Sequence, residues 1–382
     1  MTQCQNYSKS LTMSDTSANR PHTSIDIRLI HLLLLASGNS HISLKNGGKL
    51  LYGFSLTFNA SMIILKTVTA ILHSLLKYSP TVGVQLSTVL FMSARAMNVI
   101  ESIKLMVLSK RGILDDQLWW MKKGYTDLTQ GNIISIPKRL FYVCYLLCVS
   151  GMFVFHIYDK VVHPPPCYPG NSTWNTHLMI CSVQNLLNIF VAMRAAQGCL
   201  VIVYIYVHCI TFAASFQKLT ETMKSETMLC DSQLKVFNYR KQYGYLCQYV
   251  STFNDVIGFN TALSLLYLML QVVAMSIILK GNHHAGFVFT AVVLSTGFAL
   301  LMYGAICLAE AAKGPLPFLN DETREKMMSG TDQYQLRCFI KEVESAPKIS
   351  VLGFMDLDKQ QFLTIIGIIA TYFFVLLPFI NK

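Results

Sequence analysis

Charged side chains are scarce in this sequence. Only 13% of its 382 residues are Asp, Glu, Lys or Arg, whereas 53% are hydrophobic. A chain of this length with so little charge is predicted to be a polytopic membrane protein, which excludes a soluble protein with a separate catalytic domain. Residues 1–19 are polar and lack an apolar segment, so we expect no cleaved secretory signal.

Catalytic motifs are also missing. The sequence has no Gly-rich phosphate-binding loop, no His-Glu-x-x-His pattern and no Ser or Cys in a nucleophile context. Its eleven cysteines and ten histidines show no spacing typical of a metal site. We therefore expect no enzyme activity, no cofactor and no metal ion.

Long apolar runs dominate the chain instead. Seven of them are long enough to cross the hydrocarbon core as helices, whereas residues 29–35 are too few and favour an interfacial helix. The last run ends two residues before the C-terminus, so we expect its helix to be a working part and not an anchor for a later domain. The seven runs cover residues 50–76, 82–108, 140–157, 178–212, 258–279, 286–308 and 362–380.

The distribution of Lys and Arg predicts the orientation of these spans. With the N-terminus inside, the inner segments hold roughly five times as many as the outer ones, so we expect a cytoplasmic N-terminus and an extracellular C-terminus. The net charge of +11 has the same origin, and because it is spread over all inner segments we expect no nucleic-acid partner. The outer segments hold only Lys77, Lys160, Lys280 and Lys382.

Two N-glycosylation sequons bear on this topology. Asn171 begins Asn-Ser-Thr in the outer loop between the third and fourth expected spans, where we predict a glycan. Asn6 also begins a sequon but would lie in the cytoplasm, so we expect it to be unused.

Five ionisable side chains fall inside expected spans, where they are costly unless they face protein, water or each other. Glu101 and Lys104 are one helical turn apart, so we interpret them as a local ion pair with a snorkelling lysine. Arg95 and Arg194 have no partner within a turn and are expected to face a cavity or a buried acceptor; the fifth residue is Lys66.

Polar and aromatic side chains gather in the outer halves of several spans. Gln184 and Asn188 are four residues apart and share one helix face, as the wall of a ligand pocket requires. Interhelical hydrogen bonding that serves packing alone explains the same pattern equally well. The candidate ligand contacts are Arg95, His156, Tyr158, Gln184, Asn188, Gln271 and Thr296, and Asn185 and Ser295 lie beside them.

The long inner segments have helical periodicity. In residues 329–346, Leu336, Phe339, Ile340 and Val343 follow helical spacing, and residues 234–256 are similarly aromatic and periodic. With the fourth to sixth spans extended past the membrane, these segments predict a cytoplasmic helical base.

Three short motifs lie in the last third of the chain. Residues 371–379 read Thr-Tyr, five hydrophobic residues, then Pro-Phe; residues 353–358 read Gly-Phe-Met-Asp-Leu-Asp; and residues 253–258 read Phe-Asn-Asp-Val-Ile-Gly. With these motifs the chain resembles the insect gustatory and odorant receptor superfamily, and the gustatory branch more closely. That branch has Gln where this chain has Pro378. The residues that carry the resemblance are Thr371, Tyr372, Gly353 and Phe354.

The resemblance implies an all-α, seven-span, ligand-gated cation channel in the plasma membrane. Four subunits, identical or related, would surround a pore lined by the last helix, and each would hold its own small-molecule pocket. Phe379 would form the hydrophobic gate and Val375 the next ring inward. Pro378 would stand at a pore ring, where it removes a backbone donor and kinks or ends a helix, so polar lining is lost there.

Four parts of the chain are expected. They are a cytoplasmic segment with a short interfacial helix (1–49), a six-helix ligand-binding bundle (50–310), cytoplasmic anchor helices (311–360) and a pore-lining helix (361–382).

Two alternatives come from other classes of protein. A non-conducting receptor-like protein of the same fold remains open, because Pro378 could mark a lost pore. A G-protein-coupled receptor also has seven spans, but it requires the opposite orientation and third-span motifs that this sequence lacks.

Overall fold

The computed structural model describes the C-terminal half of the chain most fully. The described residues are 201–225, 233–281, 285–320, 330–351, 353 and 355–380, with 143–152 and single positions at 100, 103–104, 107–108, 111, 154 and 199. Almost all of them are helical, which confirms the all-α fold class. The first expected span and both sequons lie outside this part, as do Arg95 and Arg194.

Three helices of the described part are long and apolar enough to cross a membrane: Val201–Ser225, Val236–Leu270 and Phe289–Leu319. They fall on the fourth, fifth and sixth expected spans, and a shorter apolar helix, Val143–Met152, falls on the third. The C-terminal helix α12, Lys359–Ile380, covers the seventh. Its 22 residues make it about 33 Å long, which matches the hydrocarbon core.

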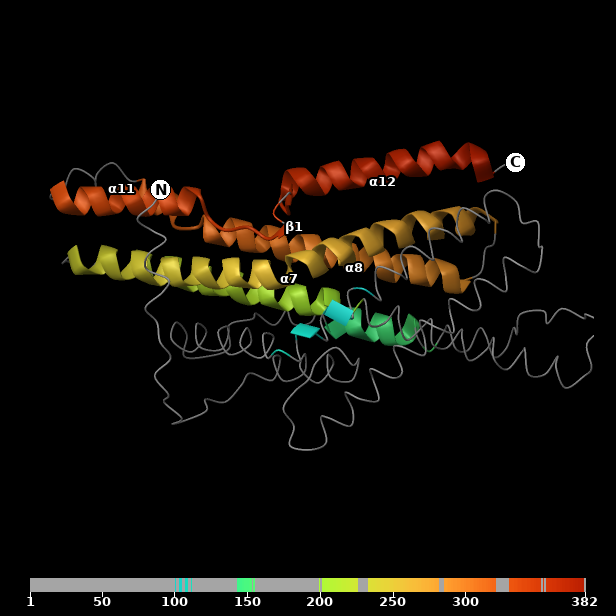
Figure 1. The fold of residues 1–382 in the computed structure, drawn as a ribbon, viewed down its shortest axis with the longest axis horizontal. Coiled ribbons are helices and arrows are strands. Elements are labelled where there is room, and N and C mark those ends of the chain that lie inside the picture. Colours follow the sequence, from blue (N-terminus) through green and yellow to red (C-terminus); the bar gives the residue numbers. More distant parts are fainter. Residues whose placement is uncertain are drawn as a thin grey trace, which may run out of the picture.

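Helix α7, Gln233–Gly281, unites two segments that the sequence suggested separately. Its 49 residues extend over about 73 Å, more than twice the hydrocarbon thickness. The periodic segment 234–256 and the fifth span are therefore one continuous helix. Helix α8, Ala285–Ala312, packs against it, and both lie along the long axis of the molecule in Figure 1.

The helix Val201–Ser225 forms the centre of the core. Most of its side chains are buried on every face, as expected of a helix that is hydrophobic all round. The imidazole of His208 stacks on Phe253 of α7 with ring centroids 4.7 Å apart, and Phe212 meets the same ring edge-on at 5.8 Å. An aromatic cluster thus joins this helix to α7.

Two glycines let α8 approach the neighbouring helices closely. A Cβ atom on Gly304 would lie 3.0 Å from Cδ2 of Tyr206 and 3.3 Å from Cβ of Cys209. On Gly297, one heptad earlier, it would overlap the hydroxyl of Tyr145 on the helix Val143–Met152, and it would lie 3.5 Å from Cδ1 of Ile202 on the central helix. Small residues at such positions are typical of tightly packed membrane helices.

Helix α11, Gly330–Glu344, packs beside the first part of α7 at the end of the molecule opposite the C-terminus (Figure 1). Leu336, Phe339 and Val343 are buried there, which confirms the helix predicted from their spacing. Nε of Arg240 on α7 donates to both carboxylate oxygens of Glu342, at 3.0 and 3.1 Å. The short helix α9, Leu316–Leu319, lies between α8 and α11 in the sequence and contacts α11.

A two-stranded antiparallel hairpin precedes α12. Strand β1, Ser350–Val351, pairs with β2, Met355–Asp356, so that Ser350 lies opposite Asp356. Gly353 in the turn has a φ of +74°, a backbone conformation that favours glycine. From this hairpin α12 runs toward the opposite end from α11 and ends near the C-terminus (Figure 1).

Candidate functional site

The start of α12 is fixed by a small group of charged side chains. Oδ1 of Asp358 accepts a hydrogen bond from the backbone N–H of Gln361 at 3.0 Å, as an N-cap residue does. Nζ of Lys348 lies 3.2 Å from Oδ2 of Asp358 and 3.3 Å from Oδ2 of Asp356. The Gln361 hydrogen bond, and after it Lys348, lower the pKa of Asp358, so this carboxylate stays ionised at neutral pH.

Asn254 of α7 clamps the hairpin to the helical bundle. Its Nδ2 donates to Oγ of Ser350 at 2.7 Å, its Oδ1 accepts from the Ser350 N–H at 3.1 Å, and Nδ2 also reaches the Lys348 carbonyl at 3.5 Å. A carboxamide supplies the donor and the acceptor together, which few side chains can do. We call this group of hydrogen bonds the Asn254 clamp. It connects α7 to the segment that leads directly into α12.

One face of α12 packs on the bundle. Ile365 is only 3% exposed, and the ring of Phe362 stacks on Phe298 of α8 with centroids 5.8 Å apart. Ile369, four residues after Ile365, packs partly buried against the same core. This face gives α12 a defined rotation about its own axis.

The other face of α12 is exposed along its length. Thr364, Ile368, Thr371 and Val375 follow at spacings of four, three and four residues, so they form one stripe. Val375 is 55% exposed. Both threonine hydroxyls donate to their own helix, Thr364 to the Gln360 carbonyl at 3.0 Å and Thr371 to the Gly367 carbonyl at 2.8 Å. The stripe is therefore mildly polar, and its threonine hydroxyls already have hydrogen-bond acceptors within α12.

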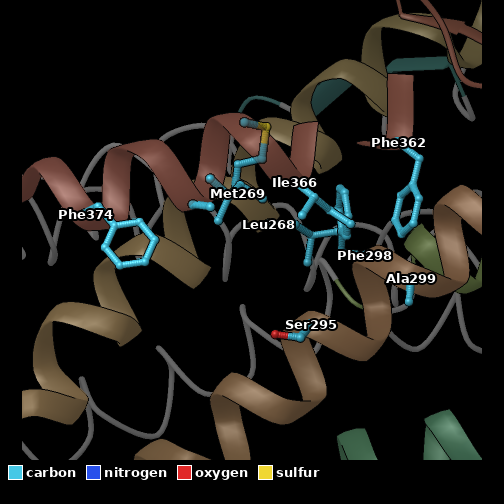
Figure 2. Close-up of a pocket in the computed structure, with 10 residues that line it drawn as sticks. Leu268, Met269, Ser295, Phe298, Ala299, Phe362, Ile366 and Phe374 are labelled. Carbon is cyan, nitrogen blue, oxygen red and sulfur yellow. The ribbon is translucent and has the colours of Figure 1, made fainter. Parts of the chain in front are cut away.

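A cavity of about 470 Å³ lies between α12, α7 and α8. Figure 2 shows its lining, with Phe374 and Phe362 of α12 at opposite ends and Ser295 of α8 across from α12. Among the lining residues only Ser295 carries a polar side chain. The cavity can hold an apolar molecule but has no charged group of its own.

The residues expected in the pore all fall on α12. Val375 is exposed, and Pro378 and Phe379 lie in the last turn of the helix. The motif residues Thr371 and Tyr372 lie on the same helix and are exposed. Pro378 was expected to kink or end the helix; α12 does not end there but continues to Ile380.

The expected ligand contacts are only partly described. Thr296 donates to the carbonyl of Val292 in its own helix at 2.8 Å, which satisfies its hydroxyl. Gln271 lies within α7. The other expected contacts lie outside the described residues: Arg95, His156, Tyr158, Gln184 and Asn188. So do Asn171, the expected glycosylation site, and Phe354 of the family motif.

Lys104 contacts an aromatic ring that the sequence reasoning did not consider. Its Nζ lies 4.4 Å from the ring centroid of Phe259 on α7, a cation–π contact. The expected partner Glu101 lies outside the described residues. The lysine therefore joins the second expected span to α7.

Comparison with known protein families gives one match. The family model described as 7tm chemosensory receptor matches residues 120–380, which is more than half of the chain. No curated protein matches the chain.

Solved structures give the same fold. Two structures of the insect olfactory receptor OR5 from Machilis hrabei, one in complex with eugenol, superpose with TM-scores of 0.59 and 0.60. Each is 14% identical to this chain and covers 92% of it, and this chain covers 97% of each. At this identity the likeness establishes a shared seven-helix fold.

These findings confirm the resemblance to the insect gustatory and odorant receptor superfamily. They also agree with the expectation that the chain is no enzyme, because its relatives are receptors. Since the family model extends over most of the chain, this protein belongs to the 7tm chemosensory receptor family.

Proposed function

We propose that this chain is a subunit of a ligand-gated, non-selective cation channel of the plasma membrane, opened by a small tastant or odorant. Four copies, or copies mixed with related subunits, surround a pore formed by α12. The gustatory branch is favoured by the Thr371-Tyr372 frame that ends in Phe379. The Lys and Arg bias supports a cytoplasmic N-terminus.

The observation that carries this proposal is the division of α12 into two faces. The packed face, with Ile365, fixes the rotation of α12 about its own axis. The side chains of the opposite stripe, with Thr371 and Val375, are exposed. Four such stripes around an axis give a passage lined by alternating small polar and apolar rings. A passage of this kind conducts when its apolar rings are wetted.

The ligand is proposed to bind in the outer half of the first six spans. Polar groups there, such as Gln184 and Asn188, can orient a molecule within an otherwise apolar pocket. The receptor OR5 from Machilis hrabei was solved with eugenol, which supports a small, mostly apolar ligand. A sugar or a bitter compound is the alternative within the same proposal.

The experiment that tests this proposal is whole-cell recording of the chain expressed alone. Sugars, bitter compounds and volatiles are applied in turn, and we expect at least one of them to evoke an inward cation current. Replacing external sodium by a large organic cation should abolish that inward current. Surface-expressed protein that stays silent alone and with related subunits would favour the non-conducting receptor.

A further inference from the structure

The cavity beneath α12 is separate from both the proposed pore and the proposed ligand pocket. Leu268 lies in the middle of the fifth expected span, and Ser295 and Ala299 lie in the middle of the sixth. Because Phe362 begins the seventh expected span, the cavity extends from the inner boundary of the membrane to about half its depth. None of the candidate ligand contacts belongs to its lining.

The lining specifies the chemistry of an occupant. A volume of about 470 Å³ falls within the range of small-molecule sites, which is about 300–1,000 Å³. Phe298, Phe374 and Met269 offer aromatic and thioether surface, which suits a compact apolar body.

Ser295 adds one requirement. It is the one polar side chain among the lining residues, and the structure leaves it exposed to the open cavity. A polar group in such surroundings costs free energy until a partner meets it. The complementary occupant carries one hydroxyl or carbonyl group, which the acyl chain of a lipid does not offer at this depth.

The cavity is open on one side of the bundle. Ile366 and Phe374 both line it and are 42% and 66% exposed. An opening within the expected span faces a region without water, so an occupant reaches it from the hydrocarbon phase. Molecules that first dissolve in the membrane are thus the relevant class.

We propose that this cavity is a second binding site, for a small membrane-soluble amphiphile with an apolar body and a single hydrogen-bonding group. The occupant touches α12 on one side and α7 and α8 on the other, so it favours the position of α12 in which the cavity is open. Binding goes beyond the proposed function and does not require a pore. An effect of the occupant on channel opening would act through α12, and that effect alone rests on the proposed function.

Photolabelling of the full chain in lipid nanodiscs tests this proposal. The reagent is azioctanol, a photoactivatable aliphatic alcohol, and the adducts are located by peptide mass spectrometry. We expect saturable labelling of the lining residues of α8 and α12 that excess octanol prevents. Ala299→Phe fills the cavity and should lower labelling about tenfold, while Ser295→Ala removes the hydroxyl and should weaken it about three- to tenfold.

Val292→Phe is the matched control for the filled cavity. Val292 lies on α8, is exposed and does not line the cavity, so the same added ring should leave labelling unchanged. All variants are compared as monodisperse protein in size-exclusion chromatography, which separates a lost site from lost folding.

Three results would overturn the proposal. They are labelling spread without saturation over exposed positions such as Leu363, undiminished labelling of folded Ala299→Phe, and capture of a phosphatidylcholine with a photoactivatable acyl chain that octanol fails to displace. Saturable labelling of a chain that carries no current would refute the channel and leave this site standing. Ligand-evoked current without saturable labelling would refute this site and leave the channel standing.

Discussion

Phe379→Ala is expected to give a current without any ligand. If four copies of α12 meet near their outer ends, the ring of Phe379 is an apolar barrier, and a small side chain lowers the cost of wetting it. The measurement is the standing whole-cell current of the variant against that of the unmodified chain at equal surface expression. Pro378→Gln restores a polar ring beside the gate and should increase the ligand-evoked current.

Leu376→Ala is the matched control for this change. Leu376 follows Ile365 by three helical turns, so we expect its side chain to face another helix and not the pore. Truncation to Ala leaves a cavity there, so it should lower the free energy of unfolding by about 2–5 kcal/mol. It should give no current without ligand. If Phe379→Ala stays silent at the cell surface and Pro378→Gln does not rescue it, the channel mechanism is wrong for this chain.

Asn254→Ala is expected to weaken the coupling between ligand binding and α12. The substitution removes every hydrogen bond of the Asn254 clamp, and it leaves the Ser350 N–H without its acceptor. Losing a net 0.5–1.5 kcal/mol per hydrogen bond predicts a half-maximal ligand concentration raised about tenfold or more, with a smaller maximal current. Concentration–response curves measured at equal surface expression give both quantities.

Two further variants separate the clamp from general damage to α7. Asn254→Asp keeps the acceptor for the Ser350 N–H, so it should lie between the native chain and Asn254→Ala. Thr252→Ala removes an exposed hydroxyl that donates to the Gln248 carbonyl of its own helix, at 2.8 Å, and should change nothing. Equal responses from Asn254→Ala and Thr252→Ala would show that the clamp carries no coupling.

Local patterns in the sequence predicted the helices well. The apolar spacing of Leu336, Phe339 and Val343 predicted both the existence of α11 and its buried face. The last apolar run predicted α12 to within three residues at its start, because helix length and hydrophobicity are properties of one segment. The cap at Asp358 is equally local but was not recognised among the family-like residues around it.

The clamp and the cavity could not be predicted in the same way. Asn254 and Ser350 are 96 residues apart, so their hydrogen bonds depend on how α7 and the hairpin dock and not on either segment alone. The polar residue Ser295 was noted in the sequence, but its place beneath α12 follows from the meeting of three helices. The Phe253–Asn254 motif marked the clamp residue without indicating its role.

The most direct test of a pore lined by α12 is the reactivity of single cysteines placed on its two faces. A positively charged thiol reagent is applied during the ligand-evoked current, with the unmodified chain as control for its native cysteines. Val375→Cys, on the open stripe, should react and lose the current, because the added charge stands in the path of the cations. Ile365→Cys, on the packed face, should keep it. Unchanged current from a demonstrably labelled Val375→Cys, or block through Ile365→Cys alone, would contradict the account.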